Sequence, residues 1–481
     1  MFLFKKKYIL KFLFSIPILL LMFFSSCTKD RVNKSNNKNL FFNESDRVCF
    51  VGNSITHVGG FHHNILLYHV TRFPANQVSF FNCGIAGDSS IDVLNRMEDD
   101  ILINNPTHAV IMLGMNDVQR YLYEASLLVD KDILEQREEA IKIYKDNLEK
   151  IVNIFIAKNI KVILQKPSIY DQTAILPEPI YMGVNDALRE CAIFIDSIAA
   201  KYKLLTVDYF SFMNKINSKI QESDSSKTLT GNDRIHPGAT GHFVMAYKFL
   251  KTEGAPRYVS KIIIDNDKTK SSEDSFNCEV SSVVQHTNGI SFSVKEYSLP
   301  FPTTNEQEEG LKIVPFLNEL NIQLLKAINL PKGQYQLLID DKAISTCTEK
   351  QLSDGVNLSE YHATPQYQKS KKVLSLLNKL WEIEWNLRDL KLIEYMKDYE
   401  TCPDKDNLEL VETYLDSVFT EKYARFSYGS YYKDQLKKYI VNKPKEEEYV
   451  KASEKLRNKI HQNAQPKVHS FVIRNYKTDI D

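Results

Sequence analysis

Four short segments of this sequence carry residue types that could move a proton or bind a developing negative charge. They are Gly52-Asn53-Ser54-Ile55-Thr56, Asn82-Cys83-Gly84-Ile85-Ala86-Gly87-Asp88, Gly114-Met115-Asn116-Asp117 and Asp233-Arg234-Ile235-His236-Pro237. A serine hydroxyl becomes a good nucleophile when a base takes its proton, and an imidazole can do this near neutral pH. Ser54 and His236 could therefore carry out acyl transfer, with Asp233 reaching back to the imidazole ring.

Each of these residues also has a plainer explanation. Ser54 could cap a helix that follows a strand. Gly84 and Gly87 could be ordinary turn glycines, and Asn116 could belong to a simple turn formed with the aspartate that follows it. His236 is one of 11 histidines. The four segments taken together favour the chemical interpretation, because a coincidence would have to occur four times.

The elements that must position these segments alternate between short apolar runs and helical patterns. The expected strands are residues 48–51, 78–82, 108–113, 160–164 and 204–208, and the clearest helices are residues 133–158 and 184–202. Almost wholly apolar strands that alternate with helices predict an α/β fold with a doubly wound, five-stranded parallel sheet of the flavodoxin type. In such a sheet the loops beyond the carboxyl ends of the strands lie on one edge, and the four segments fall there.

The blocks Ser, Gly, Asn and His in this order resemble the SGNH/GDSL hydrolase superfamily, over residues 46–250. The resemblance implies that Ser54 is the nucleophile, His236 the base and Asp233 the group that orients the base. It also implies an oxyanion hole built from the backbone N–H groups of Ser54 and Gly87 and the side-chain amide of Asn116. One departure is Asn53, which stands where the family usually has aspartate. That aspartate is neither nucleophile nor base, so we expect an altered loop with unchanged chemistry.

Several neighbouring histidines have other expected roles. His57, His62, His63 and His69 follow Ser54 closely, and a polar loop and helix face explains them better than a metal site does. We therefore predict no metal and no cofactor, with His57 as a candidate for the pocket entrance. His242 is expected to pack on its own helix. Residues 167–182 are either a substrate-facing loop or a plain connector.

The N-terminus has the features of a secretion signal. Four lysines among residues 5–11 precede an apolar run at residues 12–24, which is short beside the roughly 20 residues that a bilayer span needs. Ser25-Ser26-Cys27 resembles a bacterial lipoprotein cleavage site. We predict a lipoprotein signal peptide over residues 1–27, lipidation at Cys27 and a flexible tether over residues 28–43. An uncleaved anchor helix extending to Met1 is the alternative, and either gives a protein of the cell envelope, periplasmic or at the outer-membrane surface.

The second half of the chain has a different composition. Strand-like runs at residues 261–264, 278–284, 290–294, 322–328 and 334–339, with a turn at Asp340-Asp341, predict a β-rich region over residues 254–360. Helical patterns at residues 368–400, 408–424 and 444–462 predict a helical region over residues 361–481. Seven aromatic residues could form a sugar-stacking surface, although packing between long helices explains them more simply. They are Tyr361, Tyr367, Trp381, Trp385, Tyr428, Tyr431 and Tyr432.

Composition and charge narrow the function further. Lys and Arg number 61 and Asp and Glu also number 61, so we expect no nucleic-acid partner. We predict a surface-anchored serine esterase that forms an acyl-enzyme on Ser54 and acts on small esters or, by analogy with the family, on O-acetylated polysaccharide. The alternatives are a lipase or lysophospholipase of the same superfamily and a non-catalytic glycan-binding lipoprotein.

Overall fold

The computed structural model describes residues 40–127, 130–423 and 429–476. The chain divides into two units, residues 1–32 and 33–481, and every described residue lies in the second. The predicted signal peptide and Cys27 lie outside the described residues. Within the described ranges, no helix has the length and apolar character needed to cross a membrane.

The predicted tether needs a correction at its carboxyl end. It was expected to reach residue 43, but residues 40–42 already pack on the folded part of the chain. The Phe42 side chain is 1% exposed, and its ring lies 5.4 Å from the ring of Phe80 and 6.1 Å from that of Phe249. Burying an aromatic ring is favourable enough to fix this stretch on the core.

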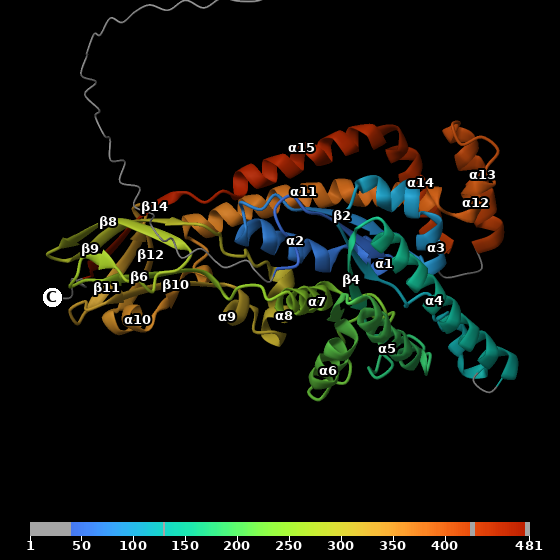
Figure 1. Ribbon diagram of the computed structural model, residues 1–481, viewed down its shortest axis with the longest axis horizontal. Coiled ribbons are helices and arrows are strands. Elements are labelled where there is room, and N and C mark those ends of the chain that lie inside the picture. Colours follow the sequence, from blue (N-terminus) through green and yellow to red (C-terminus); the bar gives the residue numbers. More distant parts are fainter. Residues whose placement is uncertain (1–39, 128–129, 424–428, 477–481) are drawn as a thin grey trace, which may run out of the picture. The chain divides into compact units, whose positions relative to one another are not determined.

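The predicted five-stranded parallel sheet is confirmed (Figure 1). Its strands run in the order β2-β1-β3-β4-β5 and all pair in parallel. The strands are β1 (Arg47–Gly52), β2 (Ser79–Gly84), β3 (His108–Met112), β4 (Lys161–Lys166) and β5 (Leu205–Asp208). All residues of β3 are buried, as expected for a strand covered on both faces.

Helices follow the strands in the manner of a doubly wound fold. They are α1 (Ser54–Val58), α2 (Gly60–Arg72), α3 (Ser90–Asn95), α4 (Lys131–Ala157), α5 (Val184–Tyr202), α6 (Tyr209–Gln221) and α7 (Ala239–Thr252). In α5 the buried residues Val184, Leu188, Cys191 and Ile195 recur every three or four positions, which places them on one face. Helix α2 packs against α7, and α4 packs against α3 and α5.

The β-rich region forms two further sheets around a shared core. One sheet has the order β13-β10-β6-β7 and the other the order β12-β11-β14-β9-β8. The strands are β6 (Tyr258–Asp265), β7 (Lys270–Ser271), β8 (Cys278–His286), β9 (Gly289–Glu296), β10 (Ile322–Ile328), β11 (Gln334–Ile339), β12 (Lys342–Thr348), β13 (Val356–Asn357) and β14 (Val468–Asn475). Asp340 and Asp341 join β11 to β12 with φ angles of 49° and 61°, which fits the predicted turn.

Strand β14 corrects the prediction that residues 361–481 are helical throughout. It lies between β9 and β11 and is antiparallel to both. His469, Phe471 and Ile473 are buried while the residues between them are more exposed, so β14 shows the two-residue period of a strand. Its partners precede it by more than a hundred residues, which is why the local pattern alone did not reveal the pairing.

The helical region runs back along the parallel-sheet domain. Helices α11 (Pro365–Glu394) and α15 (Glu446–Ala464) lie side by side (Figure 1). Helix α11 begins where Thr364 caps its first turn and Pro365 occupies the first position. The remaining helices are α8 (Glu308–Ile313), α9 (Phe316–Leu320), α10 (Glu349–Asp354), α12 (Lys397–Glu400), α13 (Leu408–Tyr423) and α14 (Gly429–Asn442). The sequence patterns did not predict α8, α9, α10 or α14.

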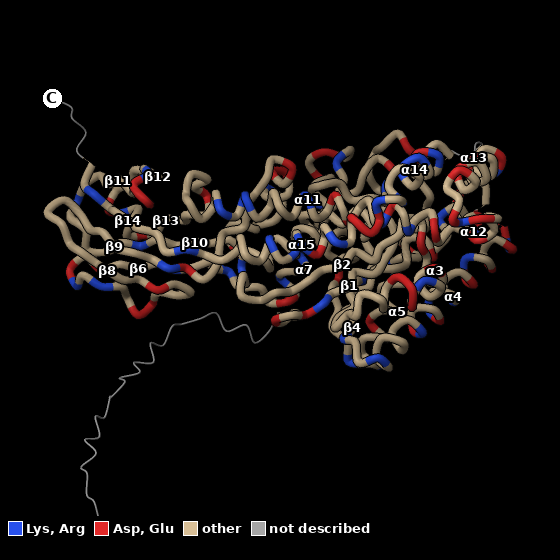
Figure 2. The backbone as a smooth tube through the Cα atoms, turned by 90° about the horizontal axis from the view of Figure 1, so that it is seen from above, with Lys and Arg blue, Asp and Glu red and all other residues tan. Residues whose placement is uncertain are grey.

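Helices α11 and α15 share the core of the parallel-sheet domain. Val373, Leu377 and Ile460 belong to the same buried cluster as strands β1 to β4. Helix α15 also contacts the sheet directly, because Arg457 donates a hydrogen bond of 2.6 Å to the carbonyl of Phe80 in β2. Because these apolar side chains lie in the shared cluster, the helical region is packed into the fold through its apolar face. Cationic and anionic residues are intermixed along the chain (Figure 2).

Candidate active site

Ser54, His236 and Asp233 lie in one hydrogen-bonded row. His236 Nε2 lies 2.7 Å from Ser54 Oγ, and His236 Nδ1 is hydrogen-bonded to Asp233 Oδ2. Because an ionised carboxylate can only accept, the ring proton lies on Nδ1 and leaves Nε2 free to accept the serine proton. The arrangement can activate the serine hydroxyl.

The position of Ser54 follows from the way β1 passes into α1. Ser54 is the first residue of α1, and Asn53 caps that helix by accepting a hydrogen bond of 3.1 Å from the backbone N–H of Ile55. A Cβ on Gly52 would lie 2.8 Å from the carbonyl oxygen of Met112 and would clash with the Thr56 side chain, so only glycine fits there. Asn53 thus performs a structural task in the loop that does not require a negative charge.

Asp233 and His236 are held by a tight turn. The N–H of Gly231 donates to the carbonyl of His236 at 2.6 Å, and Asp233 Oδ1 accepts from the N–H groups of Ile235 and His236, both at 3.0 Å. Between them Arg234, 1% exposed, turns inward and donates to backbone carbonyls of residues 171–178. The segment at residues 167–182 therefore supports the turn from behind.

The environment of Asp233 keeps it ionised. Partial burial opposes ionisation, but the hydrogen bonds from His236 and from two backbone N–H groups outweigh it and lower the pKa of Asp233 to about 2. A carboxylate that stays charged across the ordinary pH range can stabilise an imidazolium on His236.

Ser54, Gly87 and Asn116, the three predicted donors to an oxyanion, line one cavity of about 680 Å³ together with His236. Gly87 has a φ of 93°, a left-handed conformation that favours glycine. The Asn116 side-chain amide donates to the carbonyl of Asp88 at 2.7 Å, which fixes its orientation. In the part of the chain that the structure describes, no hydrogen bond engages the N–H of Ser54 or of Gly87. These groups can donate to a bound ligand.

The appended helices complete the same cavity. Seven lining residues come from α11, α13 and α14: Trp385, Asp389, Tyr423, Tyr431, Tyr432, Gln435 and Lys438. Among the seven aromatic residues considered as a sugar surface, Trp385, Tyr431 and Tyr432 lie here, whereas Tyr367 is buried elsewhere and Tyr428 lies outside the described residues. Sequence reasoning missed Asp389, Gln435 and Lys438, because nothing local marks residues more than 300 positions from Ser54 as its neighbours.

His57 connects the cavity wall formed by α11, α13 and α14 to the loop that carries Ala86 and Gly87, which we call the oxyanion loop. Its Nδ1 accepts the backbone N–H of Ala86 at 3.1 Å, so its proton is on Nε2, which lies 3.3 Å from Asp389 Oδ1. Burial lowers the pKa of His57 although Asp389 opposes the shift. A neutral imidazole of fixed tautomer thus holds the peptide just before Gly87.

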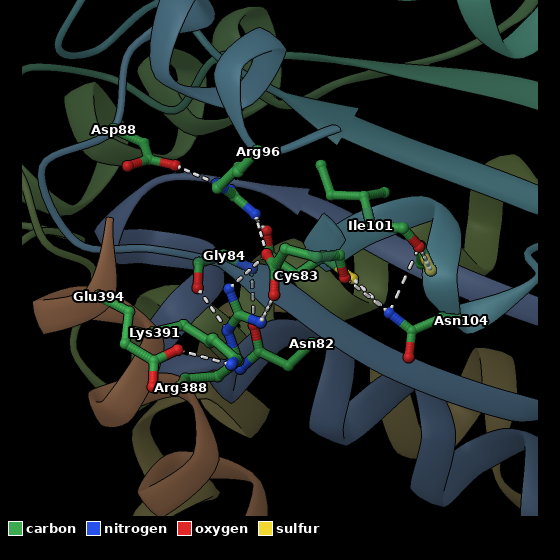
Figure 3. A network of polar contacts seen from close by, with 12 residues as sticks. Asn82, Cys83, Gly84, Asp88, Arg96, Ile101, Asn104, Arg388, Lys391 and Glu394 are labelled. Carbon is green, nitrogen blue, oxygen red and sulfur yellow. Dashed lines mark hydrogen bonds and ion pairs between the residues drawn. The ribbon is translucent and has the colours of Figure 1, made fainter. Parts of the chain in front are cut away.

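A buried charge network fastens α11 to the catalytic loops (Figure 3). The Arg388 guanidinium binds both oxygens of Asp100, at 2.7 and 2.9 Å, and donates to the carbonyl of Gly84 at 3.1 Å. Arg96 donates to Oδ2 of Asp100, which Arg388 also binds, and to the Asp88 carboxylate and the Cys83 carbonyl. Burial opposes the ionisation of Asp100, but the two guanidinium groups outweigh it and lower its pKa.

The other histidines near Ser54 have structural partners. His69 is paired with Glu253 at 3.0 Å, and His62 contacts the carbonyl of Thr56 at 3.0 Å. His63 stacks on Trp381, and His242 is buried on α7. Over the described residues, no group of three or more His, Cys, Asp or Glu side chains is placed to hold a metal ion.

Known proteins resemble this chain over two different lengths. Residues 48–249 match the family model of the GDSL-like lipase/acylhydrolases. A solved structure of BT4096, described as a gut microbial diltiazem-metabolizing enzyme, is 30% identical with a TM-score of 0.80, covering 90% of this chain and 98% of that one. An acetylxylan esterase of Geobacillus stearothermophilus is 23% identical over 230 residues, which are 44% of this chain and 94% of that protein.

The match to the diltiazem-metabolizing enzyme extends through the appended regions, whereas the acetylxylan esterase matches a length close to that of the parallel-sheet domain. The family match covers β1 to α7, the span that contains Ser54, Gly87, Asn116, Asp233 and His236. Residues 48–249 therefore form a domain of the GDSL-like lipase/acylhydrolase family, and the protein is an ester hydrolase.

Proposed function

We propose that this protein removes short acyl groups, above all acetyl, from the hydroxyls of a carbohydrate through an acyl-enzyme on Ser54. The observation that carries the proposal is the row from Asp233 through His236 to Ser54, which ends in a cavity also lined by Gly87 and Asn116. Nucleophile, base and oxyanion donors thus meet at one place.

The reaction follows from these contacts. Ser54 Oγ attacks the ester carbonyl while His236 Nε2 takes its proton, and the negative charge that forms on the carbonyl oxygen is bound by the N–H groups of Ser54 and Gly87 and the Asn116 amide. His236 then gives the proton to the departing alcohol oxygen, which leaves Ser54 acylated. Water attacks the acyl-enzyme with His236 again as base, and the acid is released with Ser54 restored.

The lining of the cavity supports a short acyl group. Among the described lining residues only Val58, Ala86 and Ile235 are aliphatic, and most of the others are aromatic or polar. A long acyl chain needs a continuous aliphatic channel, so a lipase or lysophospholipase fits less well. Similarity to an acetylxylan esterase supports a carbohydrate acetate.

The location of the enzyme is a second part of the proposal. The basic start, the short apolar run and Ser25-Ser26-Cys27 support export and lipidation at Cys27. Such an anchor would keep the esterase in the cell envelope, where polymeric carbohydrates are met. Metabolic labelling with a clickable fatty acid, compared between the wild type and Cys27→Ala, tests this part. Equal labelling of both proteins would contradict it.

Hydrolysis of an ester series tests the chemistry. The substrates are 4-nitrophenyl esters from acetyl to dodecanoyl, with Ser54→Ala and, as a matched serine control, Ser197→Ala on the exposed side of α5. We expect rates that fall steeply with chain length, vanish in Ser54→Ala and persist in Ser197→Ala. A preference for long chains would favour a lipase, and activity retained in Ser54→Ala would refute the mechanism.

A further inference from the structure

Two aromatic side chains in the cavity wall are exposed. Trp385 of α11 is 46% exposed and Tyr431 of α14 is 39% exposed, although both are large apolar groups. Both line the cavity that contains Ser54, as do Tyr423 and Tyr432. Exposed aromatic faces that gather in a concave site are a common mark of ligand binding.

These rings are held in fixed positions before any ligand binds. The indole Nε1–H of Trp385 donates to the carbonyl of Val58 at 3.0 Å. The Tyr431 and Tyr432 rings pack edge to face with centroids 5.5 Å apart, and the Tyr423 and Tyr432 rings are 5.2 Å apart. A wall of ordered rings loses little conformational entropy when it binds a ligand.

The wall is also fixed relative to Ser54. Trp381, Trp385, Arg388 and Asp389 recur at helical spacing on one face of α11, and each contacts the catalytic domain. Trp381 stacks on the ring of His63, and Trp385 donates to the Val58 carbonyl. Arg388 donates to the Gly84 carbonyl, and Asp389 contacts His57. One face of α11 thus fixes Trp385 relative to the nucleophile.

Charge in the wall argues against a cationic ligand. Asp389 is the one carboxylate among the described residues that line the cavity, but one of its oxygens lies 3.3 Å from His57 Nε2 and the other lies 3.3 Å from the Lys438 ammonium. Arg120 lines the cavity as well. Since the anion already has partners and two cations are present, a cationic ligand has no free carboxylate to bind in this wall, and the exposed rings are the groups that can contact the flat face of another ring.

We propose that Trp385 and Tyr431 form a subsite for the ring of the ester's alcohol part, supplied by the appended helices. The flat face of a neutral six-membered ring, either the C–H face of a pyranose or the π face of an aromatic ring, lies against these side chains while the acyl group lies at Ser54. This inference rests on the proposed function and adds the recognition of the leaving alcohol to it.

The test compares substrates that differ only in the alcohol. They are ethyl acetate without a ring, 4-nitrophenyl acetate with an aromatic ring and methyl tri-O-acetyl-β-xyloside with a pyranose ring, each followed by pH-stat titration. The variants are Trp385→Leu and Tyr431→Leu, which keep an apolar side chain and remove the ring. Tyr476→Leu, which removes a ring that is 42% exposed beyond β14 and does not line the cavity, is the matched control.

We expect each wall variant to lower the ratio of kcat/KM for a ring-bearing acetate to kcat/KM for ethyl acetate by about tenfold, mostly through KM. The Tyr476→Leu ratio stays at the wild-type value. A loss confined to the xyloside assigns the subsite to sugars, a loss confined to the aryl ester assigns it to aromatic alcohols, and a loss on both assigns it to ring faces in general. Equal losses on all three substrates, or no change in the ratio, would overturn the proposal.

A binding measurement separates this inference from the esterase proposal. The chain has two tryptophans, Trp381 and Trp385, so ring binding near Trp385 is expected to alter the intrinsic fluorescence of Ser54→Ala when methyl tri-O-acetyl-β-xyloside or 4-nitrophenyl acetate is added. The additional change Tyr431→Leu keeps both tryptophans, so it weakens the fluorescence change only if Tyr431 helps to bind the ring. Failure of the wild type to hydrolyse ethyl acetate would count against the proposed function, whereas unchanged quenching in the double variant counts against the subsite.

Discussion

Replacement of Arg388 by methionine tests whether the appended helix α11 supports the oxyanion loop. Arg388 is 7% exposed and has three hydrogen bonds, two to Asp100 and one to the carbonyl of Gly84. Methionine has a similar length and apolar stem, so the change removes the charge and the donors with little change in packing. Gly84 begins the loop that carries Ala86 and Gly87.

The expected decrease in the free energy of unfolding depends on which interactions of Asp100 and Gly84 remain in the variant. Loss of one partner of a buried ion pair costs about 3–5 kcal/mol when the other charge is left alone. Here Arg96 still binds Asp100, at 2.5 Å, so the full cost does not apply. The Gly84 carbonyl does lose its Arg388 donor, which by itself costs about 1–3 kcal/mol. We therefore expect a decrease in the free energy of unfolding of about 2–4 kcal/mol.

The assay has two readouts. Urea unfolding followed by circular dichroism gives the change in stability, and hydrolysis of 4-nitrophenyl acetate gives kcat. We expect kcat to fall about tenfold or more, because a shift in the Gly84 carbonyl displaces the oxyanion donors that follow it. Lys391→Met is the matched control, since Lys391 binds Glu394 and Glu446 and no catalytic loop. Wild-type stability and kcat in Arg388→Met, or an equal loss of kcat in Lys391→Met, would refute the reasoning.

Three further predictions concern the catalytic groups and the buried histidines. Asn116→Ala should lower kcat by about 100-fold or more while thermal unfolding changes little, and a near-normal rate would remove Asn116 from the oxyanion hole. Asp233→Asn should lower kcat by about 1,000-fold or more, because His236 loses the partner that holds its tautomer. The pKa of Asp233 in the folded protein, about 2, lies below the usual value of about 3.9, so its contribution to stability is present above pH 3.9 and is lost as the pH falls through 2. The stability difference between the wild type and Asp233→Asn should shrink over that window. Burial lowers the pKa of His62 to about 4, whereas the unfolded chain takes up this proton near pH 6.5. Stability should therefore fall as the pH decreases from 6.5 to 4, and melting temperatures at pH 7 and pH 5 should differ less in His62→Gln than in the wild type.

The parallel-sheet domain could be predicted from sequence because its elements repeat at short range. Five apolar strands alternate with amphipathic helices. The loops at the carboxyl ends of parallel strands share one edge of the sheet, and this rule predicts that Ser54, Gly87, Asn116 and His236 lie close together. The helix at residues 184–202 was predicted with the same bounds as α5. These features depend on spacing within about 30 residues, which is the range that periodicity can report.

The rest of the site depends on contacts that are distant along the chain. Trp385 and Tyr431 were noted as aromatic, but the local pattern of α11 and α14 is that of any packed helix, so their exposure in the cavity could not be inferred. In the sequence, nothing distinguishes Arg388 and Asp389 from the other charged residues of a long helix. Their importance comes from Asp100 and His57, which lie nearly 300 residues or more before them.

Strand β14 is the middle strand of its sheet, and this position affects how the chain folds during synthesis. Strands β9 and β11 flank β14, and β11 ends at Ile339 while β14 begins at Val468. At a synthesis rate of about 5–20 residues per second, the strand edges of β9 and β11 wait on the order of ten seconds for the segment that fills the gap between them. Open edges of this kind can pair with other chains. Folding of this sheet therefore depends on protecting a half-built surface during synthesis, a demand that the parallel sheet, complete by residue 208, does not make.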